Sequence, residues 1–248
     1  RAAMNVRGVA VSERHVVFWN GSQAQVLVRK GDAFEQLSLH ATQARAMVFY
    51  KDEYLLRACG SEVQQCNLSG RVTLKIPFSE QEGKPALLDL HGHFLGVATD
   101  AGRIKVFDLS KRGKSASGQE NNKDAQGSGP RQVGSSGRFA DSATGHSLGV
   151  MRSIAVNSTG TRVSILGDTV VGALKVLEPS SKLYVYDGDR DLVESLDFAG
   201  KGVGQSPGRI PVSHFWDKDE PKLLAVETRV LRGQAQQASG DDEDGEEE

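Results

Sequence analysis

The sequence is a succession of short runs of β-prone residues separated by short turns, and this pattern most limits what the chain can fold into. Runs such as His15–Trp19, Glu53–Ala58 and Arg103–Leu109 alternate with turn clusters such as Gly60-Ser61 and Asp100-Ala101-Gly102. No convincing amphipathic helix interrupts them. Many short strands joined by short turns predict an antiparallel all-β meander.

The meander repeats itself about every 40 residues. Gly21-Ser22-Gln23 returns as Gly60-Ser61-Glu62. Phe107-Asp108 returns as Tyr186-Asp187 once a low-complexity insert is subtracted. A period of this length, built from four strands, predicts the blades of a β-propeller.

Two of the repeats end their third strand in an aromatic residue followed by Asp, at Phe107-Asp108 and Tyr186-Asp187. We expect the ring to fill the gap between adjacent sheets and the Asp to hold the following turn by hydrogen bonds. The repeat is degenerate, because Cys66-Asn67 and Leu27-Val28 stand where such pairs are expected.

The segments divide into blades and low-complexity sequence. We expect propeller blades in residues 1–110 and 148–232, a disordered insert in 111–147, and an acidic disordered tail or truncated insert in 233–248. Between Gly113 and Gly145 the only aromatic and branched aliphatic residues are Phe139 and Val133, so little apolar surface is available to offset the entropy of ordering. The remainder predicts a partial WD40-type β-propeller of about four to five blades, each of four antiparallel strands, fewer than the seven of most WD propellers.

Charge and hydropathy exclude several function classes. The formal net charge is −2, and the last eight residues, 241–248, carry an acidic run with no basic residue. This balance does not indicate a nucleic-acid binder. No apolar run approaches the roughly 18–20 residues of a membrane-spanning helix. The first ten residues lack the apolar core of a signal peptide. Because the chain starts at Arg1, we expect it to be a fragment of a longer protein.

The residues that could carry chemistry are not arranged for it. Gly200–Gly204 is glycine-rich but leads into another strand rather than the helix that a phosphate site needs. His91 and His93 form the only close histidine pair and have no visible third ligand, and the spacing of Cys59 and Cys66 fits reduced structural thiols rather than zinc. We therefore expect no enzyme, and no catalytic, cofactor-binding or metal-binding residues.

Four passages resemble the second WD-repeat region of the intraflagellar transport protein 140 family, a subunit of transport complex A in cilia and flagella. They are Val11–Gly21, Gly92–Asp100 continuing into Phe107–Arg112, Met151–Asn157 with Arg162–Leu166, and His214–Thr228. The last of these, and the run to Lys111-Arg112, are the most distinctive. The chain departs from the family in its longer, less apolar 111–147 segment and in its acidic end.

The resemblance implies paired propellers followed by helical repeats, the latter absent here, in a scaffold without enzyme activity. It implies protein partners, the other complex A subunits, and a role in retrograde transport, cilium assembly and delivery of membrane cargo into the cilium. It also implies a location at the axoneme and basal body with a cytoplasmic pool, no nucleic-acid partner, no integral membrane segment and at most indirect contact with membrane cargo.

Two other hypotheses share the architecture. A vesicle coat or another membrane-trafficking scaffold also combines propellers with helical repeats. A propeller enzyme would need polar side chains projecting into the central channel from successive first strands. The candidate first strands, Arg45–Tyr50, Ala86–Leu90, Val150–Val156 and Pro211–Phe215, supply mostly apolar residues.

Overall fold

The structure is a computed structural model that describes residues 5–112, 129–137, 150–171, 176–199 and 208–230. In these residues the chain forms nineteen strands and no helix. The described part of the chain therefore contains no helix that could cross a membrane. Strands that follow one another in the sequence pair antiparallel, as the short turns predict. The all-β expectation is confirmed.

Five sheets follow one another along the chain. The first contains β1 (Gly8–Val11), β2 (His15–Trp19), β3 (Gln23–Lys30) and β4 (Ala33–Ala41). The second contains β5 (Met47–Tyr50), β6 (Tyr54–Cys59), β7 (Glu62–Asn67) and β8 (Val72–Pro77). The third contains β9 (Pro85–His91), β10 (Phe94–Thr99), β11 (Ile104–Arg112) and β12 (Pro130–Ser135).

The fourth sheet contains β13 (Val150–Val156), β14 (Arg162–Val171), β16 (Lys182–Asp187) and β17 (Leu192–Asp197), with β15 (Val176–Pro179) paired to the far end of β14. The fifth is the hairpin of β18 (Arg209–Trp216) and β19 (Leu224–Val230).

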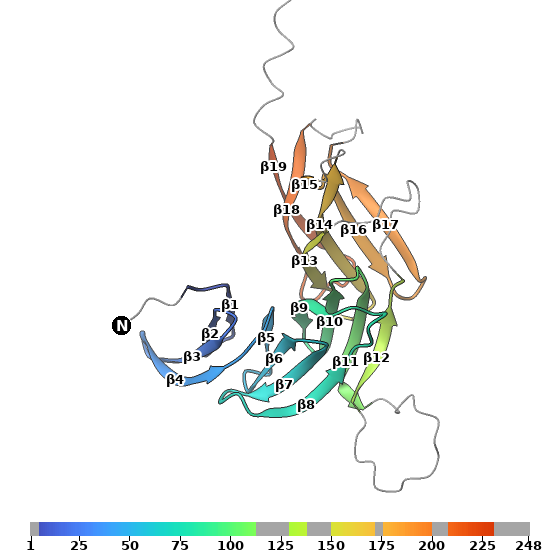
Figure 1. The fold of residues 1–248 in the computed structure, drawn as a ribbon. Coiled ribbons are helices and arrows are strands. Elements are labelled where there is room, and N and C mark those ends of the chain that lie inside the picture. Colours follow the sequence, from blue (N-terminus) through green and yellow to red (C-terminus); the bar gives the residue numbers. More distant parts are fainter. Residues whose placement is uncertain (1–4, 113–128, 138–149, 172–175, 200–207, 231–248) are drawn as a thin grey trace, which may run out of the picture.

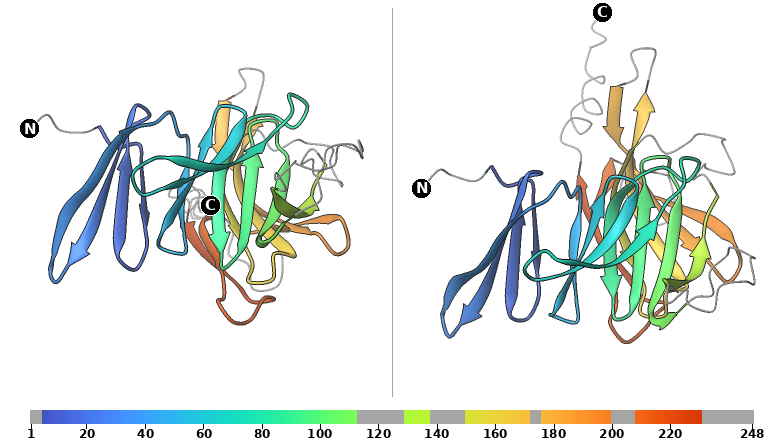
Figure 2. Two further views of the ribbon diagram at one scale, coloured as in Figure 1. Left: turned by 90° about the horizontal axis from the view of Figure 1, so that it is seen from below. Right: turned by 60° about the horizontal axis from the view of Figure 1, so that its bottom comes forward.

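The sheets stand side by side in an arc, each turned relative to the last, as Figures 1 and 2 show. The first strand of each sheet contacts the first strand of the next, from β1 through β5, β9 and β13 to β18. This is the arrangement of propeller blades around an axis. The described residues thus form four four-stranded blades and two strands of a fifth, which confirms the prediction of four to five blades.

Three clusters of apolar side chains fill the gaps between the first and second, the second and third, and the third and fourth sheets. The corresponding third-strand positions Cys66, Phe107 and Tyr186 each lie in a different cluster and are nearly inaccessible. Asp108 Oδ1 accepts the Ser110 N–H at 2.9 Å. The aromatic-Asp pairs therefore fill the gaps between sheets and hold turns as the sequence predicts.

The structure corrects the boundary of the 111–147 insert. Pro130–Ser135 forms β12, which pairs with β11 and is the outer strand of the third blade. The prediction that this stretch belongs to no blade is wrong for these residues, because backbone pairing to β11 needs few apolar side chains. Residues 113–128 and 138–149, and the tail 233–248, lie outside the described residues, so their predicted disorder stays a prediction.

Adjacent side chains of β18 differ in what they contribute to the junction between the fourth and fifth sheets. Trp216 is 7% exposed, and its indole N–H donates to the Ala155 carbonyl oxygen at 3.0 Å. The neighbouring Phe215 points to the opposite face and is 62% exposed, as strand alternation requires. Only Trp216, of the two, holds the fifth sheet to the fourth.

The same junction buries His214 between two hydroxyl groups. Its Nδ1 lies 2.7 Å from Ser164 Oγ and its Nε2 lies 3.0 Å from Ser153 Oγ. Burial lowers the pKa of His214 to about 4, because the charged ring would lose its hydration there. His214 therefore bridges the two sheets as a neutral imidazole at physiological pH.

We predict that Trp216→Ala lowers the free energy of unfolding by roughly 3–5 kcal/mol, because it leaves a cavity and an unpaired carbonyl group. Urea unfolding followed by far-ultraviolet circular dichroism measures this change. Phe215→Ala, next along the same strand, is the matched control and should change stability by less than about 1 kcal/mol. Equal losses for both variants would contradict the burial of Trp216.

A second prediction concerns the pH dependence of stability. The folded-state pKa of His214 lies below the unfolded value, so its contribution is fully present above about pH 6.5 and is lost as the pH falls toward about 4. The loss should be on the order of 2–3 kcal/mol. His214→Gln should be less stable than the wild type at pH 7, and its stability should change less across this pH range. An unchanged slope in His214→Gln would contradict the prediction.

Candidate functional site

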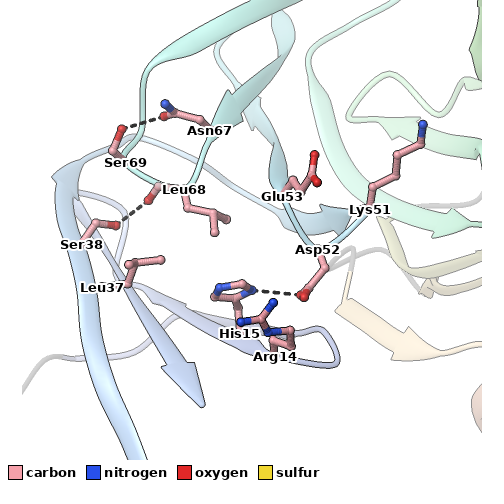
Figure 3. A pocket seen from close by; sticks show the side chains of 10 residues that line it. All are labelled: Arg14, His15, Leu37, Ser38, Lys51, Asp52, Glu53, Asn67, Leu68 and Ser69. Carbon is pink, nitrogen blue, oxygen red and sulfur yellow. Dashed lines mark hydrogen bonds and ion pairs between the residues drawn. The ribbon is translucent and has the colours of Figure 1, made fainter. Parts of the chain in front are cut away.

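A pocket of about 640 Å³ opens between the first and second sheets. Figure 3 shows ten side chains around it, from four segments of the chain. They are Arg14, His15, Leu37, Ser38, Lys51, Asp52, Glu53, Asn67, Leu68 and Ser69. The β1–β2, β5–β6 and β7–β8 turns and the middle of β4 therefore meet at one rim of the propeller.

The β5–β6 turn that lines the pocket has an unusual backbone. Lys51 and Asp52 adopt φ values of 53° and 55°, although neither is glycine. The Glu53 N–H donates to the Tyr50 carbonyl oxygen, so Lys51 and Asp52 are the two central residues of a β-turn with positive φ at both, positions that Asn-Gly or Asp-Gly usually occupy. A side chain in this region costs stability unless contacts hold it in place.

Asp52 supplies those contacts by reaching across to the first sheet. Its Oδ1 accepts a short hydrogen bond from the Ser12 hydroxyl and lies 3.0 Å from His15 Nδ1. The Arg14 backbone N–H also donates to this carboxylate. Asp52 therefore fastens the β5–β6 turn of the second sheet to the β1–β2 turn of the first.

The same contacts set the charge of the pocket. Burial acts to raise the pKa of Asp52, but the hydrogen bonds from Ser12 and His15 outweigh it, so the pKa lies below its usual value. The Lys51 ammonium lies 5.3 Å from the centre of the Tyr50 ring. Within the described residues, the Arg14 guanidinium makes no ion pair with a carboxylate. The pocket is thus lined by two cationic side chains, Arg14 and Lys51, by the ionised and hydrogen-bonded carboxylate of Asp52, and by Glu53.

Ser12, His15 and Asp52 have the residue types of a hydrolase triad but not its geometry. A triad places the imidazole between the carboxylate and the hydroxyl, so that it can take the serine proton. Here the Ser12 hydroxyl and the His15 ring both bind the same Asp52 oxygen atom, so the imidazole is not the acceptor for the hydroxyl. The arrangement serves to fix two turns and to shape a binding pocket.

The residues singled out from the sequence lie elsewhere. His91 and His93 flank the β9–β10 turn, where His93 Nδ1 lies 3.2 Å from the Tyr50 hydroxyl. Cys59 and Cys66 are free thiols. No cluster of three metal-ligating side chains occurs among the residues that the structure describes. Gly200–Gly204 lies outside the described residues.

Sequence analysis did not find this pocket. The repeat offered one usable signal, since Ser12 and Asp52 lie about one period apart, in equivalent turns of successive blades. Equivalent turns in adjacent blades must lie at the same rim. A comparison of the residues in each pair of equivalent turns could then have identified the pair with complementary side chains.

Together, the sequentially paired sheets, the packed gaps between them and the pocket at the rim define a β-propeller module of the scaffold type. The model of one family, the IFT140 second beta-propeller, matches residues 1–126 and 130–248. The chain belongs to this family, which confirms the resemblance found in the sequence.

Solved propellers share the fold at low sequence identity. The β-propeller domain of Cps50 (Swd1) from Myceliophteria thermophila is 13% identical, with a TM-score of 0.59 over 91% of this chain and 68% of that one. KlHsv2 with loop 6CD replaced by a Gly-Ser linker is 11% identical, with a TM-score of 0.53 over 82% of this chain. The chain spans 57% of the length of that KlHsv2 chain. At these identities the likeness shows the fold alone.

We predict that Asp52→Ala lowers the free energy of unfolding by about 2 kcal/mol, because it removes the hydrogen bonds to the first sheet while leaving a side chain at positive φ. Asp52→Asn should cost less, because an amide oxygen accepts hydrogen bonds and Asn tolerates this backbone. Hydrogen exchange would report faster exchange of the His15 amide in Asp52→Ala. Unchanged exchange there would contradict the proposed fastening of the two turns.

Proposed function

We propose that this chain is a segment of a scaffold subunit of intraflagellar transport complex A that holds other subunits in place for retrograde transport. The observation that carries the proposal is the family match, which covers both blade regions. The proposal extends to the roles tied to that complex: cilium assembly, delivery of membrane cargo into the cilium, and location at the cilium with a cytoplasmic pool.

The architecture is consistent with such a role. Packed clusters join the first four sheets, and side-chain hydrogen bonds cross all four junctions, so turns at the rims keep fixed relative positions. Rigid elements that present loops are a common basis for binding several protein partners. Partner proteins would contact such turns, and membrane cargo would be contacted through partners.

The function can be tested in a flagellated cell that lacks the intact gene product. A tagged full-length protein without residues 1–232 should recover less of the other complex A subunits than the intact protein. Particles should accumulate at flagellar tips, because return transport would fail. A matched control lacks only residues 113–128, outside the described sheets, and should recover the complex normally.

Two outcomes would contradict the proposal. Full recovery of complex A with flagella of normal length would show that this segment is not needed as a scaffold. Recovery of vesicle-coat subunits in place of complex A would favour the trafficking-coat hypothesis, which rests on shared architecture alone.

A further inference from the structure

The outer strand of the first sheet, β4, contains neither lysine nor proline, the residues that most often protect an exposed strand. The strand β4 is nine residues long and carries three large apolar side chains, Phe34, Leu37 and Leu39, each about half exposed. Its one carboxylate, Glu35, is paired with Lys30 at 2.6 Å. An open edge of this kind can pair with another chain.

The other outer strands carry features that oppose such pairing. Strand β8 contains Lys75 and ends in Pro77, and β12 begins with Pro130 and Arg131. Strand β17 contains Glu194. Charges and proline on an edge disfavour the addition of a strand. Among the four complete blades, only β4 combines length, apolar side chains and the absence of both lysine and proline.

An irregularity in β4 directs one of its apolar residues toward the pocket. Val26 pairs with Ser38 but Leu27 pairs with Gln36, so Leu37 is the extra residue of a β-bulge. Leu37 lines the pocket with Leu68, and Figure 3 shows their side chains facing the same space. The Ser38 hydroxyl donates to the Leu68 carbonyl oxygen and fixes the strand there. The pocket therefore adjoins the middle of the open edge.

The charges at the pocket select among occupants. Asp52 already accepts hydrogen bonds from Ser12, His15 and the Arg14 backbone. Its carboxylate is therefore a poor partner for a cation on an added ligand. The Arg14 guanidinium lines the same pocket and, within the described part of the chain, forms no ion pair with Glu53, the other carboxylate of the pocket, or with any other carboxylate. An occupant that carries a carboxylate complements it.

We propose that the β4 edge and this pocket form a binding site for an extended peptide segment of a partner protein. The segment adds a strand to the first sheet through main-chain hydrogen bonds, seats an apolar side chain between Leu37 and Leu68, and places a carboxylate at Arg14. In strand addition, main-chain bonds supply affinity and pockets for alternate side chains supply specificity. The inference rests on the proposed scaffold function in so far as that function requires protein partners.

The test uses the purified full-length protein and a phage library of random peptides of about twelve residues. Peptides enriched on the wild type should contain an apolar residue close to an acidic one. Leu37→Ser and Arg14→Glu should each weaken the binding of an enriched synthetic peptide at least about tenfold. Leu39→Ser is the matched control, because Leu39 lies on the same strand without lining the pocket, and it should weaken binding less than about threefold.

N-methylation of the enriched peptide tests strand addition itself. Two peptides are compared, one methylated on its odd-numbered amides and one on its even-numbered amides; only one of these two phases removes the N–H groups that face β4. One phase should abolish binding and the other should preserve it. Equal binding of both phases, equal enrichment on wild type and Leu37→Ser, or self-association of the protein through β4 would overturn the proposal. Recovery of complex A by the Leu37→Ser variant is measured separately, so failure here leaves the scaffold test intact.

Discussion

Burial of both faces of each sheet that stands between two others is the constraint on which the structure depends. Successive side chains of a strand point to opposite faces, so a strand placed between two neighbouring blades must be apolar at consecutive positions. Leu55 and Leu56 show this, since Leu55 lies in the cluster facing the first sheet and Leu56 in the cluster facing the third. A blade that stands between two others needs both neighbours to bury this pattern, which makes the array cooperative.

Polar contacts between sheets then set how the blades are aligned. Asp89 of the third sheet accepts the Val156 backbone N–H of the fourth at 2.8 Å. Burial raises the pKa of Asp89 despite this bond, so its ionised form costs stability near neutral pH. The Asp89–Val156 hydrogen bond therefore fixes how the third and fourth sheets are aligned rather than adding to the net stability of the fold. Neutral His214 gives the next junction the same alignment without a buried charge.

Much of this fold could be predicted from the sequence, because strand alternation and turn chemistry are local properties. The blade repeat and the roles of Phe107-Asp108 and Tyr186-Asp187 followed from them. Strands β12 and β15 could not be predicted, because they join their sheets by backbone pairing to β11 and β14. Amino-acid composition does not indicate such pairing. The pocket was missed for a related reason: it joins turns of different blades, and only the Ser12–Asp52 contact reveals it.

The two positions that depart from the aromatic-Asp pattern of the repeat lie near the pocket. Asn67 Oδ1 accepts the Arg71 N–H at 2.9 Å, so the amide holds its turn as Asp108 and Asp187 do, without a charge. With Asn67 in place of the Asp of the third and fourth sheets, the turn is held and the wall of the pocket has an uncharged amide at this position. In the first sheet, Leu27 stands at the degenerate position, and the bulge that displaces Leu37 begins opposite it. Departures from a repeat are tolerated where the neighbours compensate, and they gather at functional sites. Here Asn67 lines the pocket and the bulge opposite Leu27 adds Leu37 to its lining, which is consistent with the proposed binding site.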